Sequence, residues 1–211
     1  SGDIPARSGV GSSSSFTVGF LNAINTQMGY FASKRELALR AIDIEQNILK
    51  ENIGSQDQIA AAFGGFNQIN LKGNNFNVDP IILQKKNLKA LEESIIFCYT
   101  GHPRDSDKIA KKQIKNIPNK KFELNAMTEL SREALKVLHK KKFNLKEFGN
   151  LLNQQWLLKK NLNPFSTNNL INTLYEIAIN NGAYGGKITG AGAGGFLLLI
   201  APKYKHEIIK K

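Results

Sequence analysis

Apolar residues recur at helical spacing near the start of the chain. Phe16, Phe20, Ile24 and Met28 follow one another at intervals of four residues. This spacing predicts a helix, because residues four apart lie on the same helical face. The glycine-serine run "PARSGVGSSSSF" leads directly into this stripe. We therefore expect the serines to form the first turn of a helix and not a flexible linker.

A second helix is predicted to begin at Ser33. Ser33 and Glu36 have the spacing of a capping box, in which each side chain binds a free backbone N–H of the first turn. The predicted inner stripe of this helix consists of Leu37, Ala41, Ile44 and Ile48. The helix is expected to end near Lys50.

The remaining pattern mixes helices with short strands. Strands are predicted within "FNQINLKGNNFNV", a hairpin about a Gly-Asn turn, and within "SIIFCYTG", "AYGGKIT" and "FLLLIAP". Helices are predicted within residues 55–65 and 79–93 and around residues 106–116, 125–140, 144–160 and 167–181. This mixture indicates the α+β class. A boundary near residue 92 divides the chain into predicted domains 1–92 and 93–211.

Composition narrows the class of protein. The chain has 211 residues with no long apolar run, so we expect no membrane span and no membrane partner. Its single cysteine, Cys98, lies in a strand-like apolar run and is interpreted as a small buried hydrophobe. One cysteine permits no internal disulfide and favours a reducing, cytoplasmic location. Both ends of the sequence look cut.

The net charge of +12 suggests three kinds of anionic partner: nucleic acid, an acidic membrane surface or a small anionic substrate. The lysine clusters lie inside amphipathic patterns and lack the aromatic and glycine interleaving of RNA-binding strands. Solvated helix faces explain them better than a nucleic-acid surface. We expect no nucleic-acid partner, and the oligomeric state is left open.

The opening run is the first candidate for chemistry. Gly9 and Gly11 permit positive φ and close approach of the backbone. A helix N-terminus adds free N–H groups and a partial positive charge. Together these features suit an anion, and serine hydroxyls can also bind Mg²⁺. A plain serine-capped helix explains the run equally well.

Two acidic residues follow on the next helical segments. Glu45 is predicted to project from the middle of an apolar face formed by Ala41, Ile42, Ile48 and Leu49. A carboxylate on such a face needs a cation, a metal or a hydrogen-bond donor. Asp57 opens a short helix, where an acidic residue is ordinary. In a phosphoryl-transfer enzyme it would instead accept a hydroxyl proton. Near the C-terminus, six glycines within Gly185–Gly195 indicate either a close backbone approach or a packed turn.

The order of these parts resembles the GHMP kinases, a superfamily that includes galactokinase, homoserine kinase and mevalonate kinase. "DIPARSGVGSSSSFTVGFLNA" is similar to their second motif, and "GKITGAGAGGFLLL" is similar to their third. Within the superfamily, "DIPARSGVGSSSSFTVG", "IEQNILKENIGSQDQIAAAFGG" and "YTGHPRDS" most resemble the D-glycero-D-manno-heptose 7-phosphate kinases. The resemblance covers nearly the whole chain, but the family's first motif is absent.

The resemblance implies roles for particular residues. ATP phosphates would lie against the residues of the opening loop: Pro5, Gly9, Val10, Gly11, Ser12, Ser13 and Ser14. Mg²⁺ would be bound by Ser13, with Ser12 the second candidate, and by Glu45. Asp57 would act on the sugar hydroxyl, and Arg104 would hold the sugar phosphate. The floor beneath the transferred phosphate and the substrate would be shaped by Gly190, Gly192, Gly194 and Gly195.

The implied activity is transfer of phosphate from ATP to the anomeric hydroxyl of the heptose phosphate, which gives a 1,7-bisphosphate for nucleotide-activated heptose. The implied fold has an incomplete N-terminal domain like ribosomal protein S5 domain 2 and a ferredoxin-like C-terminal domain. Alternatives are another GHMP sugar-1-kinase, such as an L-fucose kinase, and a nucleotide-binding homologue without catalysis.

Overall fold

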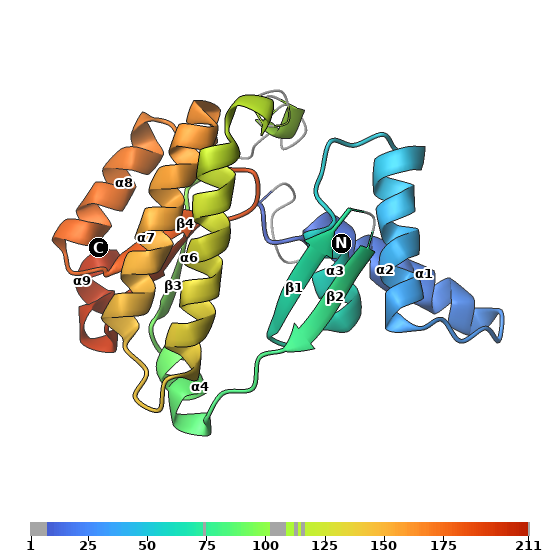
Figure 1. Cartoon of the computed structure of the whole chain (residues 1–211), viewed down its shortest axis with the longest axis horizontal. Helices are drawn as coiled ribbons and strands as arrows, with labels where there is room; N and C mark the ends of the chain where they lie inside the picture. The colour runs from blue at the N-terminus through green and yellow to red at the C-terminus, as the bar shows by residue number, and fades with distance from the viewer. Residues whose placement is uncertain (1–7, 74, 102–108, 112–113, 115–116, 211) are drawn as a thin grey trace. The chain divides into compact units, whose positions relative to one another are not determined.

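The computed structural model describes residues 8–73, 75–101, 109–111, 114 and 117–210. Within these ranges the chain forms two compact units (Figure 1). The first unit contains Gly11–Ile82, and the second contains Ser8–Val10 and Leu83–Lys211. The predicted boundary near residue 92 coincides with the end of a helix that belongs to the second unit. The division into domains at that residue stays a prediction.

The first unit consists of helices and a hairpin. Its elements are α1 (Ser12–Gln27), α2 (Lys34–Asp43), the π-helical turn η1 (Ile44–Ile48), α3 (Gln56–Phe63), β1 (Asn67–Lys72) and β2 (Asn75–Pro80). The strands pair antiparallel, with Ile69 opposite Val78, which confirms the predicted hairpin. The Ser33 hydroxyl accepts a hydrogen bond from the Glu36 amide, as the capping-box spacing predicts.

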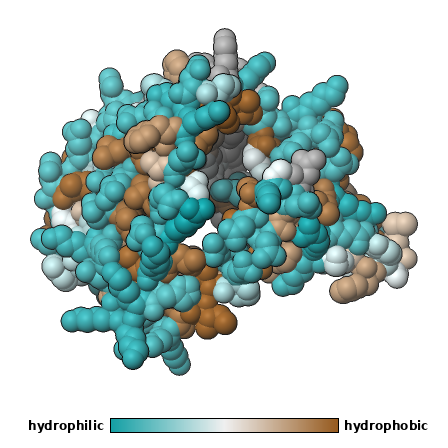
Figure 2. Space-filling model, viewed as in Figure 1, coloured by the Kyte–Doolittle hydropathy of each residue, from teal (hydrophilic) through white to brown (hydrophobic). Residues whose placement is uncertain are grey.

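The apolar stripe of α1 is exposed, although the helix it predicts is confirmed. Phe16 is 70% exposed and Met28 is 77% exposed, and the rings of Phe16 and Phe20 stack with centroids 5.7 Å apart. Hydrophobic side chains are visible at the surface around the end of α1 in Figure 2. The buried face of α1 instead carries Ser14, Val18 and Asn25. Spacing therefore identifies the helix but not the face that packs.

The second unit is built around a small antiparallel sheet. Its elements are α4 (Lys85–Glu92), β3 (Ile95–Tyr99), η2 (Ile117–Asn119), α6 (Lys121–His139), α7 (Leu145–Leu162), η3 (Pro164–Ser166), α8 (Asn169–Asn180), β4 (Gly185–Ile188), β5 (Phe196–Ile200), η4 (Lys203–Lys205) and α9 (His206–Lys210). Among the described strands, the order is β3-β5-β4. The predicted glycine-rich connection joins β4 to β5, so it lies at one end of the sheet.

The core of this unit lies between one face of the sheet and helices α7 and α8. Ile96, Leu197 and Leu199 pack there with Trp156, whose side chain is fully buried. The prediction that Cys98 is buried is only partly correct, because its side chain is half-buried. Cys98 lies on β3, which is an edge strand of the described sheet. No helix in the described ranges is long and apolar enough to cross a membrane.

Candidate active site

The glycine-serine run forms the start of α1 as predicted. Gly9 and Gly11 have φ of 81° and 72°, a left-handed conformation that glycine adopts without strain. The chain enters the helix at Ser12, and the first backbone bond of the helix runs from the Ser15 amide to the Gly11 carbonyl at 2.9 Å. The N–H groups that precede Ser15 in the helix have no helical acceptor, so they are available to an anion.

Glu45 is the centre of a buried polar cluster in the first unit. Its side chain is 0% exposed. Its Oε1 accepts hydrogen bonds from Ser13 Oγ at 3.0 Å and Thr17 Oγ1 at 3.1 Å. Its Oε2 accepts from Ser14 Oγ at 2.9 Å and from the Gln58 amide. Hydroxyl and amide donors therefore solvate the charge, and no described residue forms a salt bridge with it.

The burial of Glu45 is confirmed, but the helical face predicted around it is partly wrong. Ala41 is buried, whereas Ile48 is 66% exposed and Leu49 also faces solvent. The cause is the π-helical turn over Ile44–Ile48, which replaces the last turn of the predicted α-helix. A π-turn has more residues per turn, so it rotates the following side chains away from their expected direction.

Helix α3 brings two further side chains to the cluster. Gln58 is fully buried and donates to Glu45, while its own Oε1 has no hydrogen-bond partner among the described residues. Asp57 lies in the first turn of α3 and is half-buried. A Cβ placed on Gly11 would be 3.6 Å from the Cβ and Cγ of Asp57. The loop backbone and the Asp57 carboxylate are therefore neighbours.

The donor set of this cluster fits a hard divalent cation. Carboxylate and hydroxyl oxygens are the ligands that Mg²⁺ prefers, and Ser13 is exposed while Glu45 is buried. No group of three His, Cys, Asp or Glu side chains with metal-binding geometry occurs in the described ranges. Mg²⁺ characteristically binds through one or two carboxylates together with substrate phosphates, so a site with a single carboxylate suits that mode.

The second glycine-rich loop lies in the second unit against Ser8. The Phe196 amide donates to the Ser8 carbonyl at 3.2 Å. A Cβ on Gly195 would lie 2.0 Å from the Ser8 carbonyl oxygen, and one on Gly192 would lie 2.4 Å from the Ser166 carbonyl oxygen. Neither position has room for a side chain. The close backbone approach inferred from the glycine density is therefore present at these two positions.

The structure brings together most of the predicted site residues, in two groups. Gly11, Ser13, Ser14, Glu45 and Asp57 share the first unit, whereas Gly9 and Val10 belong to the second unit with the glycines at positions 190, 192, 194 and 195. Ser12 forms no hydrogen bond to Glu45. Pro5 and Arg104 lie outside the described residues, so their predicted roles stay predictions.

Sequence reasoning missed two members of the cluster, Thr17 and Gln58. Thr17 lies one helical turn after Ser13, so its i+4 spacing was a usable signal. Gln58 had no comparable signal, because a glutamine in a short helix is ordinarily exposed.

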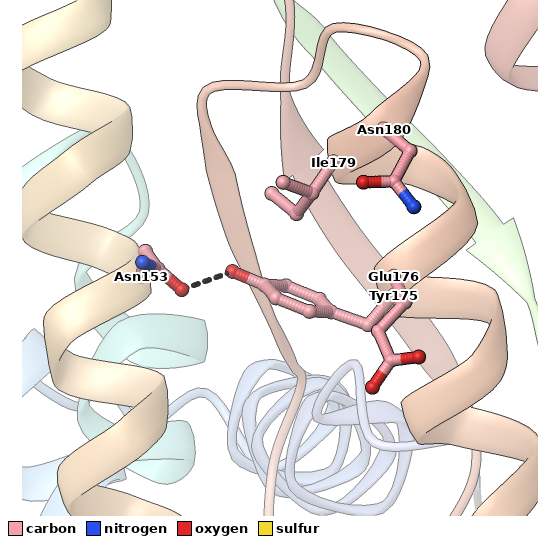
Figure 3. A pocket seen from close by; sticks show the side chains of 5 residues that line it. All are labelled: Asn153, Tyr175, Glu176, Ile179 and Asn180. Atoms are coloured by element: carbon pink, nitrogen blue, oxygen red, sulfur yellow. Dashed lines mark hydrogen bonds between the residues drawn. The ribbon is translucent and has the colours of Figure 1, made fainter.

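A shallow hollow between α7 and α8 lies apart from both glycine-rich loops in sequence. Its volume is about 390 Å³, and its lining includes Asn153, Glu176 and Ile179. The Tyr175 hydroxyl donates to Asn153 Oδ1 at 2.6 Å, which ties α8 to α7 (Figure 3). Burial raises the pKa of Tyr175 to about 12. The hollow therefore lies beside the contact between α7 and α8 in which Tyr175 takes part, and burial there favours the neutral form of the Tyr175 side chain.

Taken separately, the units define a two-part α+β protein: a glycine-serine loop opens a helix beside a buried glutamate, and a glycine-rich loop joins two strands. Residues 1–65 match the model of the GHMP kinases N terminal domain. Residues 131–211 match that of the GHMP kinases C terminal domain. The chain therefore belongs to the GHMP kinase family, and the predicted family and fold class are confirmed.

Individual relatives are similar over nearly the whole chain. A D-glycero-alpha-D-manno-heptose 7-phosphate kinase from Campylobacter jejuni is 33% identical over 99% of this chain and 62% of its own length. The crystal structure of a D-glycero-D-manno-heptose 1-phosphate kinase from Bacteroides thetaiotaomicron is 26% identical, with a TM-score of 0.67 over 98% of this chain and 57% of that chain. A putative sugar kinase from Campylobacter jejuni is 27% identical, with a TM-score of 0.71 and the same coverages. The chain thus spans less than two thirds of each relative.

Proposed function

We propose that this protein is an ATP-dependent sugar kinase that phosphorylates the anomeric hydroxyl of D-glycero-D-manno-heptose 7-phosphate. The observation that carries the proposal is the cluster around Glu45: a buried carboxylate is joined to hydroxyls in the first turn of a helix, and Asp57 lies beside the loop that opens that helix. The sugar phosphate is taken from the name of the Campylobacter jejuni relative, and the Bacteroides structure is named for the same heptose as its 1-phosphate.

The start of α1 binds the nucleotide phosphates in this proposal. Backbone N–H groups at the helix N-terminus donate to phosphate oxygens, and the helix dipole favours their negative charge. The positive φ of Gly9 and Gly11 lets the backbone approach the phosphates without a side chain between them. These donors are fixed before the reaction, so they stabilise charge without reorganising.

Ser13 and Glu45 would hold Mg²⁺. Mg²⁺ held there would supply positive charge that offsets the negative charge of the nucleotide phosphates. Thr17 donates a hydrogen bond to Oε1 of Glu45 and Gln58 donates one to Oε2, so these two side chains orient the carboxylate. Ser14 is buried and also donates to Glu45, so we assign it to support and Ser13 to contact with the metal.

Asp57 would receive or orient the proton of the sugar hydroxyl. The hydroxyl oxygen forms a bond to the γ-phosphorus, the bond from that phosphorus to the bridging oxygen breaks, and ADP leaves with the electron pair. The proton passes from the hydroxyl to the Asp57 carboxylate. Positioning supplies most of the rate enhancement in this class of reaction, so the neighbouring loop and carboxylate matter more than a strong base.

A coupled ADP-release assay on the full-length protein tests the proposal. We expect turnover with D-glycero-D-manno-heptose 7-phosphate and none with L-fucose, galactose or mevalonate. Product analysis should find the new phosphate on the anomeric oxygen. Turnover with L-fucose alone would replace the sugar assignment with the fucose-kinase alternative. ATP binding without turnover of any of these four compounds would support the non-catalytic alternative.

A further inference from the structure

The Thr17 hydroxyl lies within hydrogen-bond distance of two acceptors in the first unit. Its Oγ1 is 3.1 Å from Glu45 Oε1 and 3.2 Å from the carbonyl oxygen of Ser13, one helical turn before it. A hydroxyl has a single proton, so it donates fully to one of these oxygens at a time. Rotation about the Cβ–Oγ1 bond exchanges the two acceptors without moving a heavy atom. Thr17 therefore has two hydrogen-bonding arrangements available in the same rotamer.

The carboxylate of Glu45 accepts as many hydrogen bonds as it has lone pairs. An ionised carboxylate offers about four lone-pair positions, shared equally between its oxygens. Ser13 and Thr17 donate to Oε1. Ser14 and Gln58 donate to Oε2. A cation that binds either oxygen must therefore replace one of these donors.

Thr17 is the donor whose replacement needs the least rearrangement. The two side chains that donate to Oε2 are buried, whereas Ser13, which donates to Oε1, is exposed. Ser13 can bind a cation through a lone pair of its hydroxyl while its proton stays on Glu45. Thr17 has the Ser13 carbonyl as its second acceptor, and a helical carbonyl can accept a side-chain hydroxyl in addition to its helical bond.

We propose that Thr17 is a positioning residue that competes with the cation for Oε1 of Glu45. When a cation binds at Ser13 and Glu45, the Thr17 hydroxyl turns to the Ser13 carbonyl. A hydrogen bond to a charged acceptor is about twice as strong as one to a neutral acceptor, so this turn opposes cation binding. The inference rests on the proposed kinase function and deepens it, because it identifies a residue that lowers the affinity of the proposed metal site.

Thr17→Val in the full-length protein tests the competition, because it keeps the shape of the side chain and removes the hydroxyl. Isothermal titration calorimetry of ATP, with and without Mg²⁺, measures the Mg²⁺-dependent gain in affinity. We expect this gain to be about fivefold larger in Thr17→Val than in the wild type, since the variant has no hydrogen bond to Glu45 to give up. Thr17→Ser keeps the hydroxyl and should restore the wild-type gain.

Thr26→Val is the matched control on the same helix. The Thr26 hydroxyl donates to the Asn22 carbonyl at 2.8 Å, four residues before it, and this hydrogen bond does not involve Glu45. The control therefore removes a hydroxyl bound to a helical carbonyl and should leave the Mg²⁺-dependent gain at its wild-type value. Without nucleotide, the melting temperature should fall further in Thr17→Val than in Thr26→Val. Saturating Mg²⁺ and ATP should bring the two decreases closer together, because both hydroxyls then bind only a helical carbonyl.

The possible outcomes separate the inference from the proposed function. A gain in Thr17→Val that is equal to or smaller than that of the wild type overturns the inference, because Thr17 would then only orient the carboxylate. A wild-type ATP affinity that does not depend on Mg²⁺ refutes the proposed metal site and the inference with it. The predicted gains without turnover of any sugar would refute the kinase function and support the competition at Glu45. If Thr17→Val does not fold, Thr17→Ala removes the same donor and decides between the same outcomes.

Discussion

Replacing Glu45 by glutamine should separate metal binding from folding. In the native cluster each carboxylate oxygen accepts two hydrogen bonds. The glutamine oxygen can still accept two, but the amide nitrogen cannot accept any. Two adjustments are available if that nitrogen replaces Oε2. The Ser14 hydroxyl can turn to accept, and the Gln58 amide can turn to present the oxygen that is now unpaired.

The stability cost of Glu45→Gln should therefore be small. Hydrogen bonds to a charged group contribute about 1.5–3 kcal/mol each, roughly twice the neutral value. Losing that excess is partly offset, because a buried carboxylate no longer has to be desolvated. We expect the free energy of unfolding to change by less than about 2 kcal/mol. Glu45→Ala leaves a cavity and unpaired donors, so it should cost about 3–5 kcal/mol.

The effect of Glu45→Gln on Mg²⁺-dependent ATP binding should be larger than its effect on stability. Isothermal titration calorimetry with and without Mg²⁺ measures the ATP affinity, and chemical unfolding followed by circular dichroism measures the free energy of unfolding. We expect Glu45→Gln to bind metal-free ATP like the wild type and to lose at least about tenfold of the Mg²⁺-dependent gain in affinity, or about 1.4 kcal/mol. An unchanged Mg²⁺-dependent gain would refute the metal assignment. A variant that fails to fold would refute the compensation by Gln58.

Three further outcomes are expected. Asp57→Asn should keep ATP affinity by calorimetry and lose at least about 100-fold in turnover, and a loss of ATP affinity would contradict its role in proton transfer. Gly195→Ala should destabilise the protein strongly, because the added Cβ would lie 2.0 Å from the Ser8 carbonyl oxygen. Gly19→Ala is the control: a Cβ there would have no atom within 4 Å, so the substitution should stabilise α1 by about 0.5–1 kcal/mol. Equal melting temperatures of the two variants would refute the close approach at Gly195. The folded pKa of Tyr175 is raised to about 12, so its stabilising contribution is complete below pH 10.0 and is lost as pH rises toward 12. After a discount for solvent screening, the wild type should lose on the order of 2 kcal/mol more than Tyr175→Phe across that window in unfolding titrations.

Local spacing was sufficient to predict the elements of the first unit and the burial of Glu45. The capping box at Ser33 and the i, i+4 stripes need only neighbouring residues, so one sequence contains the signal. The π-helical turn was not predictable in this way. It depends on tertiary contacts that hold Glu45 inward at the cost of regular helical bonding, and Ile48 is exposed as a result.

The same reasoning that identified Glu45 applied to Lys159 but was not extended to it. Both are charged residues on a buried helical stripe. Lys159 was not considered, although it lies three residues after Trp156 on the same helical face. The exposed stripe of α1 shows the converse error, since apolar spacing alone does not say which face another element covers.

The single tryptophan is an intrinsic fluorescence probe of the second unit only. Trp156 is fully buried in the second unit, and the first unit has no tryptophan. Its fluorescence therefore reports the unfolding of the second unit, whereas circular dichroism reports helices in both. If the two signals change together in denaturant, the units unfold as one cooperative block. If the fluorescence transition is displaced, each half has its own stability, and the effect of a substitution in the glycine-serine loop can be measured separately from the stability of the second unit.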